Sequence, residues 1–141
     1  MWSQGVQVTA NSAPSLVSAI KYPAASNTYT YNVKPRFRAT LGTDPDGDNL
    51  YLGWSLYDST TQTWPVSTTW LSSAYAGGTT ISWQCSTSLT RGHTYILYCY
   101  QKDPSGLTAS GTAPSRTFIV GTPASAVSSG NLIDDATMDN L

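Results

Sequence analysis

The sequence contains no glutamate and little charge of either sign. Only 11% of its 141 residues are charged, and all eight acidic residues are aspartates, whereas about 25% of the residues in a typical domain are charged. The seven basic residues are spread thinly, with Lys34, Arg36 and Arg38 as the one local group. Phosphate binding needs clustered Lys and Arg, so this composition argues against a nucleic-acid partner.

Groups that could carry out catalysis are equally scarce. His93 is the sole histidine, and there is no glutamate to work beside an aspartate as general acid and base. The sequence has no Gly-x-Ser-x-Gly elbow and no glycine-rich phosphate loop. Cys85, His93 and Cys99 do not have the spacing of a zinc site. The sequence therefore predicts that the protein is not an enzyme and needs no cofactor, apart from the calcium considered below.

Long apolar runs are also missing. No stretch approaches the roughly 20 residues that span a membrane, so no membrane partner is expected. Residues 1–10 have neither the basic region nor the apolar core of a signal peptide. The polar, charge-poor composition nevertheless suggests an extracellular protein. Three origins fit both observations: a piece of a larger secreted protein, export by another route, or a virion protein released by lysis.

The residues that are abundant favour strands. Ser and Thr together account for 39 of 141 residues, and Thr, Tyr, Trp and Val suit a pleated, half-buried surface. Alternating apolar and polar residues between turn signals predict an all-β antiparallel sandwich. We expect about seven strands, at 15–20, 35–41, 50–58, 63–66, 79–84, 93–101 and 116–120, with a short edge strand within 22–34. The strand at 63–66 is expected to be short because Pro65 suits only an edge.

The composition also divides the chain. We expect an N-terminal extension at 1–13, the sandwich at 14–120, and a Ser/Ala/Gly linker followed by an acidic tail at 121–141. Apolar residues in the tail, Leu132, Ile133 and Met138, could dock on a partner. The alternative is a solvated terminus with no fixed contacts.

Three segments carry a resemblance to a known family: PRFRATLGTDPDGDNLYLGWSLYD, SLTRGHTY and RTFIV. They resemble the immunoglobulin/fibronectin-III-like repeats of secreted and cell-surface actinobacterial proteins and of phage minor tail and virion-surface proteins. The resemblance covers residues 11–120 and implies a β-sandwich. It also implies that Tyr95 is the corner tyrosine before the sixth strand and that Trp54 is the core aromatic residue of the third.

A tyrosine-rich outer face is the clearest functional signal. If Trp54 points into the core, alternate positions on 50–58 and 93–101 point outward, and these strands are neighbours in the resembling fold. Tyr suits an interface because it combines apolar area with a polar tip. The predicted interface residues are Tyr51, Tyr57, Ile96, Tyr98 and Tyr100. This face either binds another molecule or is covered by the tail, the N-terminal segment, or the segment that holds Trp64 and Trp70.

The acidic turn at 44–49 (DPDGDN) allows two interpretations. Ca²⁺ prefers several carboxylate and carbonyl oxygens on a flexible loop. Asp44, Asp46 and Asp48 would supply three carboxylates, and Asp103 from the turn after the sixth strand would supply a fourth. The same residues make a good β-turn without an ion, which is the simpler interpretation.

Cys85 and Cys99 are expected to be two separate thiols. Cys85 follows the fifth strand, while Cys99 lies about six residues along the sixth strand from the shared end. That separation is near 20 Å, which is beyond disulfide reach.

These observations predict a non-catalytic structural or interaction domain on a virion or extracellular surface. We favour a bacteriophage virion accessory protein, a capsid decoration or tail-associated protein, that docks through its outer face and termini. Its partner would be a copy of itself, a capsid protein or a tail protein. The alternatives are an adhesion or spacer module of a secreted actinobacterial cell-surface protein, and a carbohydrate-binding module that stacks glycans on Tyr and Trp.

Overall fold

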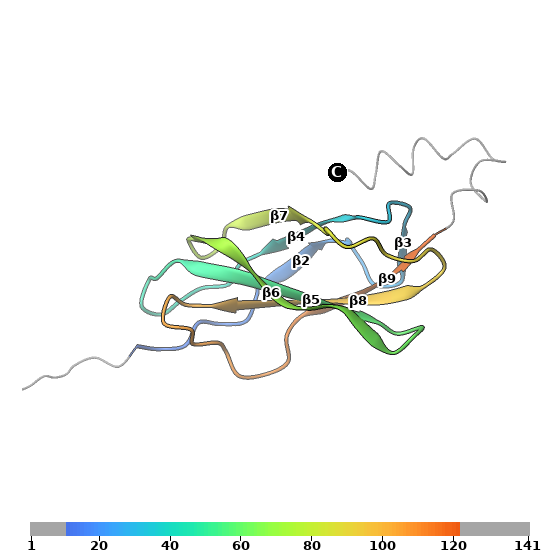
Figure 1. The fold of residues 1–141 in the computed structure, drawn as a ribbon. Coiled ribbons are helices and arrows are strands. Elements are labelled where there is room, and N and C mark those ends of the chain that lie inside the picture. Colours follow the sequence, from blue (N-terminus) through green and yellow to red (C-terminus); the bar gives the residue numbers. More distant parts are fainter. Residues whose placement is uncertain (1–10, 122–141) are drawn as a thin grey trace, which may run out of the picture.

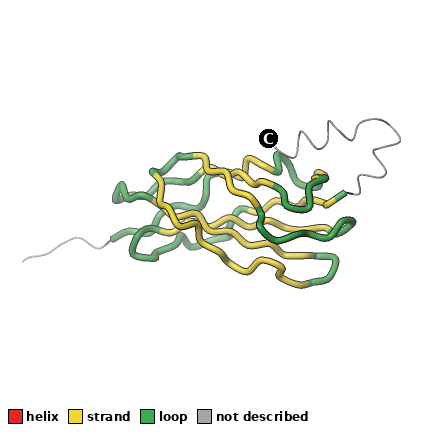
Figure 2. The backbone as a smooth tube through the Cα atoms, turned by 45° about the horizontal axis from the view of Figure 1, so that its top comes forward, coloured by secondary structure: helices red, strands yellow, loops and turns green. Residues whose placement is uncertain are grey.

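The computed structural model describes residues 11–121. Within this range the chain forms two β-sheets packed face to face and no helix (Figures 1 and 2). The predicted all-β sandwich is therefore confirmed. The three-stranded sheet has the order β2 (Ala19–Tyr22), β4 (Arg36–Thr40), β7 (Thr80–Gln84). The five-stranded sheet has the order β3 (Thr28–Thr30), β9 (Ser115–Val120), β8 (Thr94–Lys102), β5 (Leu50–Asp58), β6 (Thr63–Tyr75).

No helix long and apolar enough to cross a membrane occurs in the described part of the chain.

Alternation of apolar and polar side chains builds the central strands. On β8, Tyr95, Leu97 and Cys99 are buried, and the residues between them are half-buried. Side chains on a strand point alternately to its two faces, so this pattern gives one core face and one outer face. On β5 the core face is as predicted, and Gly53 and Ser55 on its outer face are also buried.

Four aromatic rings join the two sheets. Phe37 on β4 is fully buried, with its ring centroid 5.7 Å from that of Trp54 on β5, 5.9 Å from Trp83 on β7 and 5.6 Å from Phe118 on β9. The rings are tilted by 51° to 58°, which suits the quadrupoles of aromatic rings. Residues from both sheets thus share one contact at the centre of the core.

Tyr95 fastens the connection between β7 and β8. Its ring is buried, and its hydroxyl accepts a hydrogen bond from the backbone N–H of Thr90 at 2.8 Å. This is the corner role that the family resemblance implied. The bond satisfies a half-buried backbone donor, and it orients the loop from which β8 begins.

A His–Asp pair, which the sequence did not reveal, fastens the hairpin between β5 and β6. Asp58 is buried, and His93 Nδ1 lies 2.8 Å from its Oδ2. The other carboxylate oxygen accepts the N–H groups of Thr60 at 2.9 Å and Thr61 at 3.2 Å. Burial alone would raise the pKa of Asp58, but the hydrogen bonds from His93, Thr61 and Thr60 outweigh it and lower the pKa.

Two predicted features near the N-terminal end of the sandwich were wrong. The first described strand begins at Ala19 instead of 15, because the N–H groups of Ser15 and Ser18 donate to carbonyl groups around the end of β4 without joining its ladder. The five-stranded sheet is also not wholly antiparallel, since β3 pairs with β9 in parallel from Thr28↔Phe118 to Thr30↔Val120. The chain crosses from one sheet to the other between β2 and β3 and enters the second sheet alongside β9.

The strand expected at 63–66 is much longer. β6 runs from Thr63 to Tyr75 along the edge of the five-stranded sheet. Pro65 does not end it, because an edge strand needs its N–H groups on only one side. Three irregularities in the register between β5 and β6 allow the long edge strand to follow its twisted neighbour.

Of the three predicted segments, only the sandwich at 14–120 lies within the described range. The extension at 1–13 and the tail at 121–141 stay predictions, because most of their residues lie outside it.

The Tyr95 hydroxyl gives a direct test of the corner. We expect Tyr95→Phe to lower the free energy of unfolding by about 1–3 kcal/mol, because it leaves the Thr90 N–H without its acceptor. Urea-induced unfolding measures the change. Tyr29→Phe is the matched control, since Tyr29 is 59% exposed and its hydroxyl is free to bond with water. Equal stability of the two variants would contradict the role of Tyr95.

The carboxylate of Asp58 makes stability depend on pH. Its pKa in the folded chain lies below the ordinary 3.8, so its contribution is present above pH 3.8 and is lost as the pH falls through the folded pKa. We expect Asp58→Asn to be less stable than the native chain at neutral pH by about 1–3 kcal/mol. The gap should shrink as the pH falls below 3.8. Thermal unfolding across this pH range measures it, and a gap independent of pH would refute the assignment.

Candidate functional site

The ladder between β5 and β8 brings the five predicted interface residues together. Tyr57 is paired with Ile96, Ser55 with Tyr98, and Gly53 with Tyr100, and outward side chains on paired strands lie side by side. All five are half-buried on the face of the five-stranded sheet that points away from the other sheet. We call this surface the outer face.

Trp64, at the start of β6, caps one end of the outer face. Its ring centroid lies 4.9 Å from that of Tyr57 and 5.9 Å from that of Tyr98. The side chain of Trp64 itself is 53% exposed. One of the alternatives from the sequence, cover by the segment with Trp64 and Trp70, thus describes part of this face. The cover replaces exposed tyrosine with an exposed tryptophan, so an aromatic surface remains.

Trp70 lies across β5 in the other half of the outer face. It can do so because Gly53 has no side chain: a Cβ atom there would stand 2.6 Å from the Trp70 ring. The Nζ of Lys102 lies 4.3 Å from the Trp70 centroid and 5.8 Å from that of Tyr51, within the range of a cation–π contact. The glycine and the lysine hold the indole flat against the sheet.

The polar groups beneath these rings are satisfied. The hydroxyls of Ser55 and Tyr100 are 2.8 Å apart and share a hydrogen bond, and Ser55 is buried. A buried hydroxyl without a partner would be costly. This hydrogen bond therefore joins β5 and β8 through their side chains at the centre of the outer face and satisfies the buried hydroxyl of Ser55.

A cavity of about 300 Å³ opens beside Trp70 and Tyr100. Its other walls come from Cys99 and Gln101 on β8, Thr68 on β6, the lead-in at 15–16 and the connection between β8 and β9 at 108–113. That connection swings out on the outer side of the five-stranded sheet (Figure 1). No charged side chain lines the cavity.

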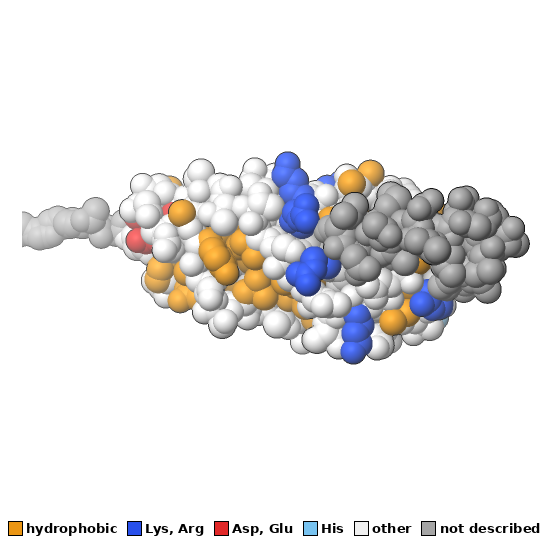
Figure 3. Space-filling model, turned by 90° about the horizontal axis from the view of Figure 1, so that it is seen from above, with side chains coloured by type: hydrophobic (Ala, Val, Ile, Leu, Met, Phe, Trp, Pro, Cys, Tyr) orange, Lys and Arg blue, Asp and Glu red, His pale blue; other side chains and the backbone are white. Residues whose placement is uncertain are grey.

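The two faces of the sandwich differ in charge. From Ser59 to Thr90, which includes all of β6, the chain has no Lys, Arg, His or Asp. Among the described strand residues on the outer face, Lys102 is the one charged residue. By contrast, Lys and Arg side chains cross the side that bears the three-stranded sheet (Figure 3), and Arg36 on β4 is exposed there.

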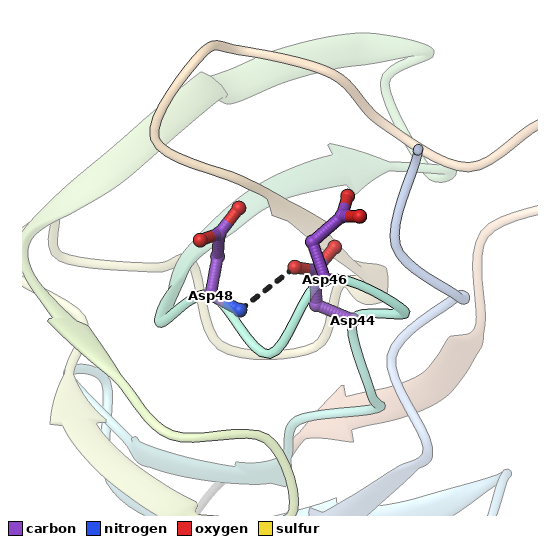
Figure 4. A group of neighbouring side chains, drawn as sticks. All are labelled: Asp44, Asp46 and Asp48. Carbon is purple, nitrogen blue, oxygen red and sulfur yellow. Dashed lines mark hydrogen bonds between the residues drawn. The ribbon is translucent and has the colours of Figure 1, made fainter. Parts of the chain in front are cut away.

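The three aspartates of the acidic turn lie together at one end of the sandwich. Carboxylate oxygens of Asp44, Asp46 and Asp48 lie within 4.8 Å of one another, and Asp44 Oδ2 accepts the N–H of Asp48 at 2.8 Å (Figure 4). Asp46 Oδ2 accepts the N–H of Ser12 at 2.7 Å. Burial raises the pKa of Asp48, and the charges of Asp44, Asp46 and Asp103 raise it further.

Asp103 does not join this group. It is fully buried, and its carboxylate accepts hydrogen bonds from the side chain of Asn11 and the backbone of Ser105 and Leu107, at 2.6 to 3.0 Å. Burial alone would raise its pKa, but these bonds and that from the Ser105 hydroxyl lower it. The carboxylate is already used to hold its own turn.

The remaining predicted residues are those of the tail and the two cysteines. Leu132, Ile133 and Met138 lie outside the described residues. Cys85 and Cys99 are buried and unpaired, as predicted. Burial raises the pKa of Cys99 to about 12 despite the nearby charge of Arg116, so this thiol stays protonated at neutral pH.

Comparison with known proteins adds evidence on the fold. No protein-family model and no curated protein matches the chain. Among solved structures, it is similar to the PKD domain of an M14-like peptidase from Thermoplasmatales archaeon SCGC AB-540-F20, with 19% sequence identity and a TM-score of 0.54. The match covers 80% of this chain and 100% of that domain. At this identity the likeness shows the fold, an immunoglobulin-like sandwich, and it gives no support to an origin in a phage or an actinobacterium.

Proposed function

We propose that the chain is a non-catalytic interaction module that binds its partner through the outer face. One observation carries the proposal: Trp64 is 53% exposed on top of Tyr57 and Tyr98, on a face that has a single charge among its described strand residues. Interfaces are enriched in Trp and Tyr and depleted of charge at their centre. On the three-stranded sheet, the outward positions of β4 and β7 hold Arg, Thr, Ser and Gln and no aromatic residue.

The PKD-like fold supports an accessory role. The similar structure is a domain of a peptidase, and a fold of this kind hosts many functions. The chain has one histidine and no glutamate, so few groups are available for general acid–base catalysis. We therefore infer a binding role, and the charge-poor composition favours a place outside the cell.

A more specific setting, a bacteriophage virion accessory protein that docks on a capsid or tail protein, stays a prediction from the sequence. So do the two alternatives, an adhesion or spacer module and a carbohydrate-binding module. The exposed indole of Trp64 favours the last of these most directly, because sugar rings stack on aromatic faces.

Substitutions on the two faces test the binding surface. We expect Trp64→Ala combined with Tyr98→Ala to weaken binding by about tenfold or more, because each removes an aromatic contact from the outer face. The binding assays use two probes, a glycan array and immobilised purified virions. The matched control is Arg36→Ala combined with Ser82→Ala on the three-stranded sheet. Binding that is lost in the control and kept in the outer-face variant would refute the proposal.

We also propose a calcium site at the acidic turn, on the evidence of one atom. Asp44 Oδ1 is buried and has no hydrogen-bond partner among the described residues, and it belongs to three carboxylates within 4.8 Å of one another. Ca²⁺ takes six to eight oxygen ligands, which these carboxylates can supply together with backbone carbonyls and water. Asp103 is not a ligand in this proposal, because its oxygens are already bonded.

Calcium should then stabilise the fold. At a concentration of 100 times Kd, binding adds about 2.7 kcal/mol to the free energy of unfolding, which raises Tm by several degrees. We expect Asp48→Asn to abolish this response and Asp58→Asn, outside the turn, to keep it. Thermal unfolding with calcium and with a chelator measures both. A native Tm that is equal in the two conditions would exclude the site.

A further inference from the structure

We propose that the outer face binds a second copy of this chain in a two-fold dimer, with Trp64 of each copy entering the cavity of the other. The inference rests on the proposed function, because it names the partner of the same surface. It draws on two features that the binding role alone does not explain, the exposed indole and the uncharged cavity.

Trp64 is a projecting apolar group with a fixed base. Its ring packs on Tyr57 and Tyr98 at 4.9 and 5.9 Å, so it is held in place while more than half of its surface stays in water. An aromatic side chain that is already ordered loses little conformational entropy on binding. Such residues are typical anchors of interfaces.

The cavity offers a matching site. Its 300 Å³ lies at the lower end of the range for ligand pockets, about 300–1,000 Å³, and suits one large side chain. Trp70 and Tyr100 form an aromatic wall, and the side chain of Thr68 and the connection at 108–113 complete the rim. Because no charged side chain lines it, an indole can enter without desolvating a charge.

The positions of the two features allow both contacts to form at once. Trp64 stands beside Tyr57 and Tyr98, while the cavity lies beside Trp70 and Tyr100. Trp70 is opposite Gly53 and Trp64 packs on Tyr57, four residues further along β5, so the two tryptophans are about 13 Å apart along the sheet. When two outer faces meet with their strands antiparallel, each indole faces the partner's cavity. An isologous contact of this kind closes as a dimer.

The area and charge of the face also suit a second copy. The five strands are 3 to 13 residues long and about 4.8 Å apart, so the face covers roughly 600 Å². Two faces that meet over their full extent bury about 1,200 Å², above the roughly 1,000 Å² that a specific interface needs. Lys102 is the one charge on the described strands of this face, and it lies at the cavity end. In the antiparallel arrangement the two lysines are at opposite ends, so like charges do not meet.

Sedimentation equilibrium of the full chain over a concentration series tests the dimer. We expect the native chain to form dimers with a Kd below about 1 mM, and Trp64→Ala to weaken the association by about tenfold or more. Ala109→Phe should weaken it similarly by filling the cavity from its rim. Arg36→Ala, which removes an exposed side chain from β4 in the other sheet, is the control and should leave the association unchanged.

Mixing the two variants separates a direct contact from a disturbance of the fold. Trp64→Ala keeps its cavity and Ala109→Phe keeps its indole, so an equal mixture can form one of the two contacts. Its association should be stronger than that of either variant alone and weaker than that of the native chain. A mixture no stronger than its components would overturn the proposal, as would a native chain that stays monomeric or forms open-ended chains. A monomeric native chain whose outer-face variants still lose glycan or virion binding would overturn the dimer and leave the proposed function standing.

Discussion

The packing of Phe37 against three aromatic rings holds the two sheets together, and the rest of the structure is arranged around that contact. Trp54, Trp83 and Phe118 come from three different strands, so loss of the Phe37 ring would open a cavity that touches both sheets, at about 3–5 kcal/mol for Phe→Ala. Because Trp54 points inward, Gly53 and Ser55 on either side of it must point outward. The inward position of Trp54 in the core therefore determines which residues lie at the centre of the outer face.

Acidic, basic and nearly uncharged regions occupy different parts of the surface. Three aspartates gather at one end of the sandwich, basic side chains lie over the three-stranded sheet (Figure 3), and the outer face has almost none. A face with little charge can be brought close to another surface without a large desolvation penalty. A face with clustered charges would lose more hydration free energy in such a contact and would remain in water. This separation is what makes the aromatic cluster usable for binding.

The sequence was informative wherever local patterns decide structure. Strict alternation located β4, β5 and β8 and identified the outward tyrosines, because one face of each strand must enter the core. It failed where long-range contacts decide. The parallel pairing of β3 depends on where the chain crosses between the sheets, and Trp70 reaches Gly53 only because β6 continues past Pro65. Asp103 is held apart from the acidic turn partly by a hydrogen bond from Asn11, which is distant in sequence. Local sequence patterns do not predict such long-range contacts.

The edge strand β6 bears on the choice between a face and an edge in the proposed dimer. A long, uncharged edge strand is a template for pairing with another chain, and β6 has no charge among its residues Thr63–Tyr75. Pro65 and the three register irregularities interrupt the row of free backbone groups, which are the usual devices against such pairing. The irregularities also change which face the side chains take, because Trp64 and Trp70 lie on the outer face while Val66, an even number of residues from both, is buried opposite Leu56. The backbone edge of β6 is therefore poorly suited to pairing with another strand. Its two tryptophans, Trp64 and Trp70, instead place their rings on the outer face, where they are available for contact with a partner.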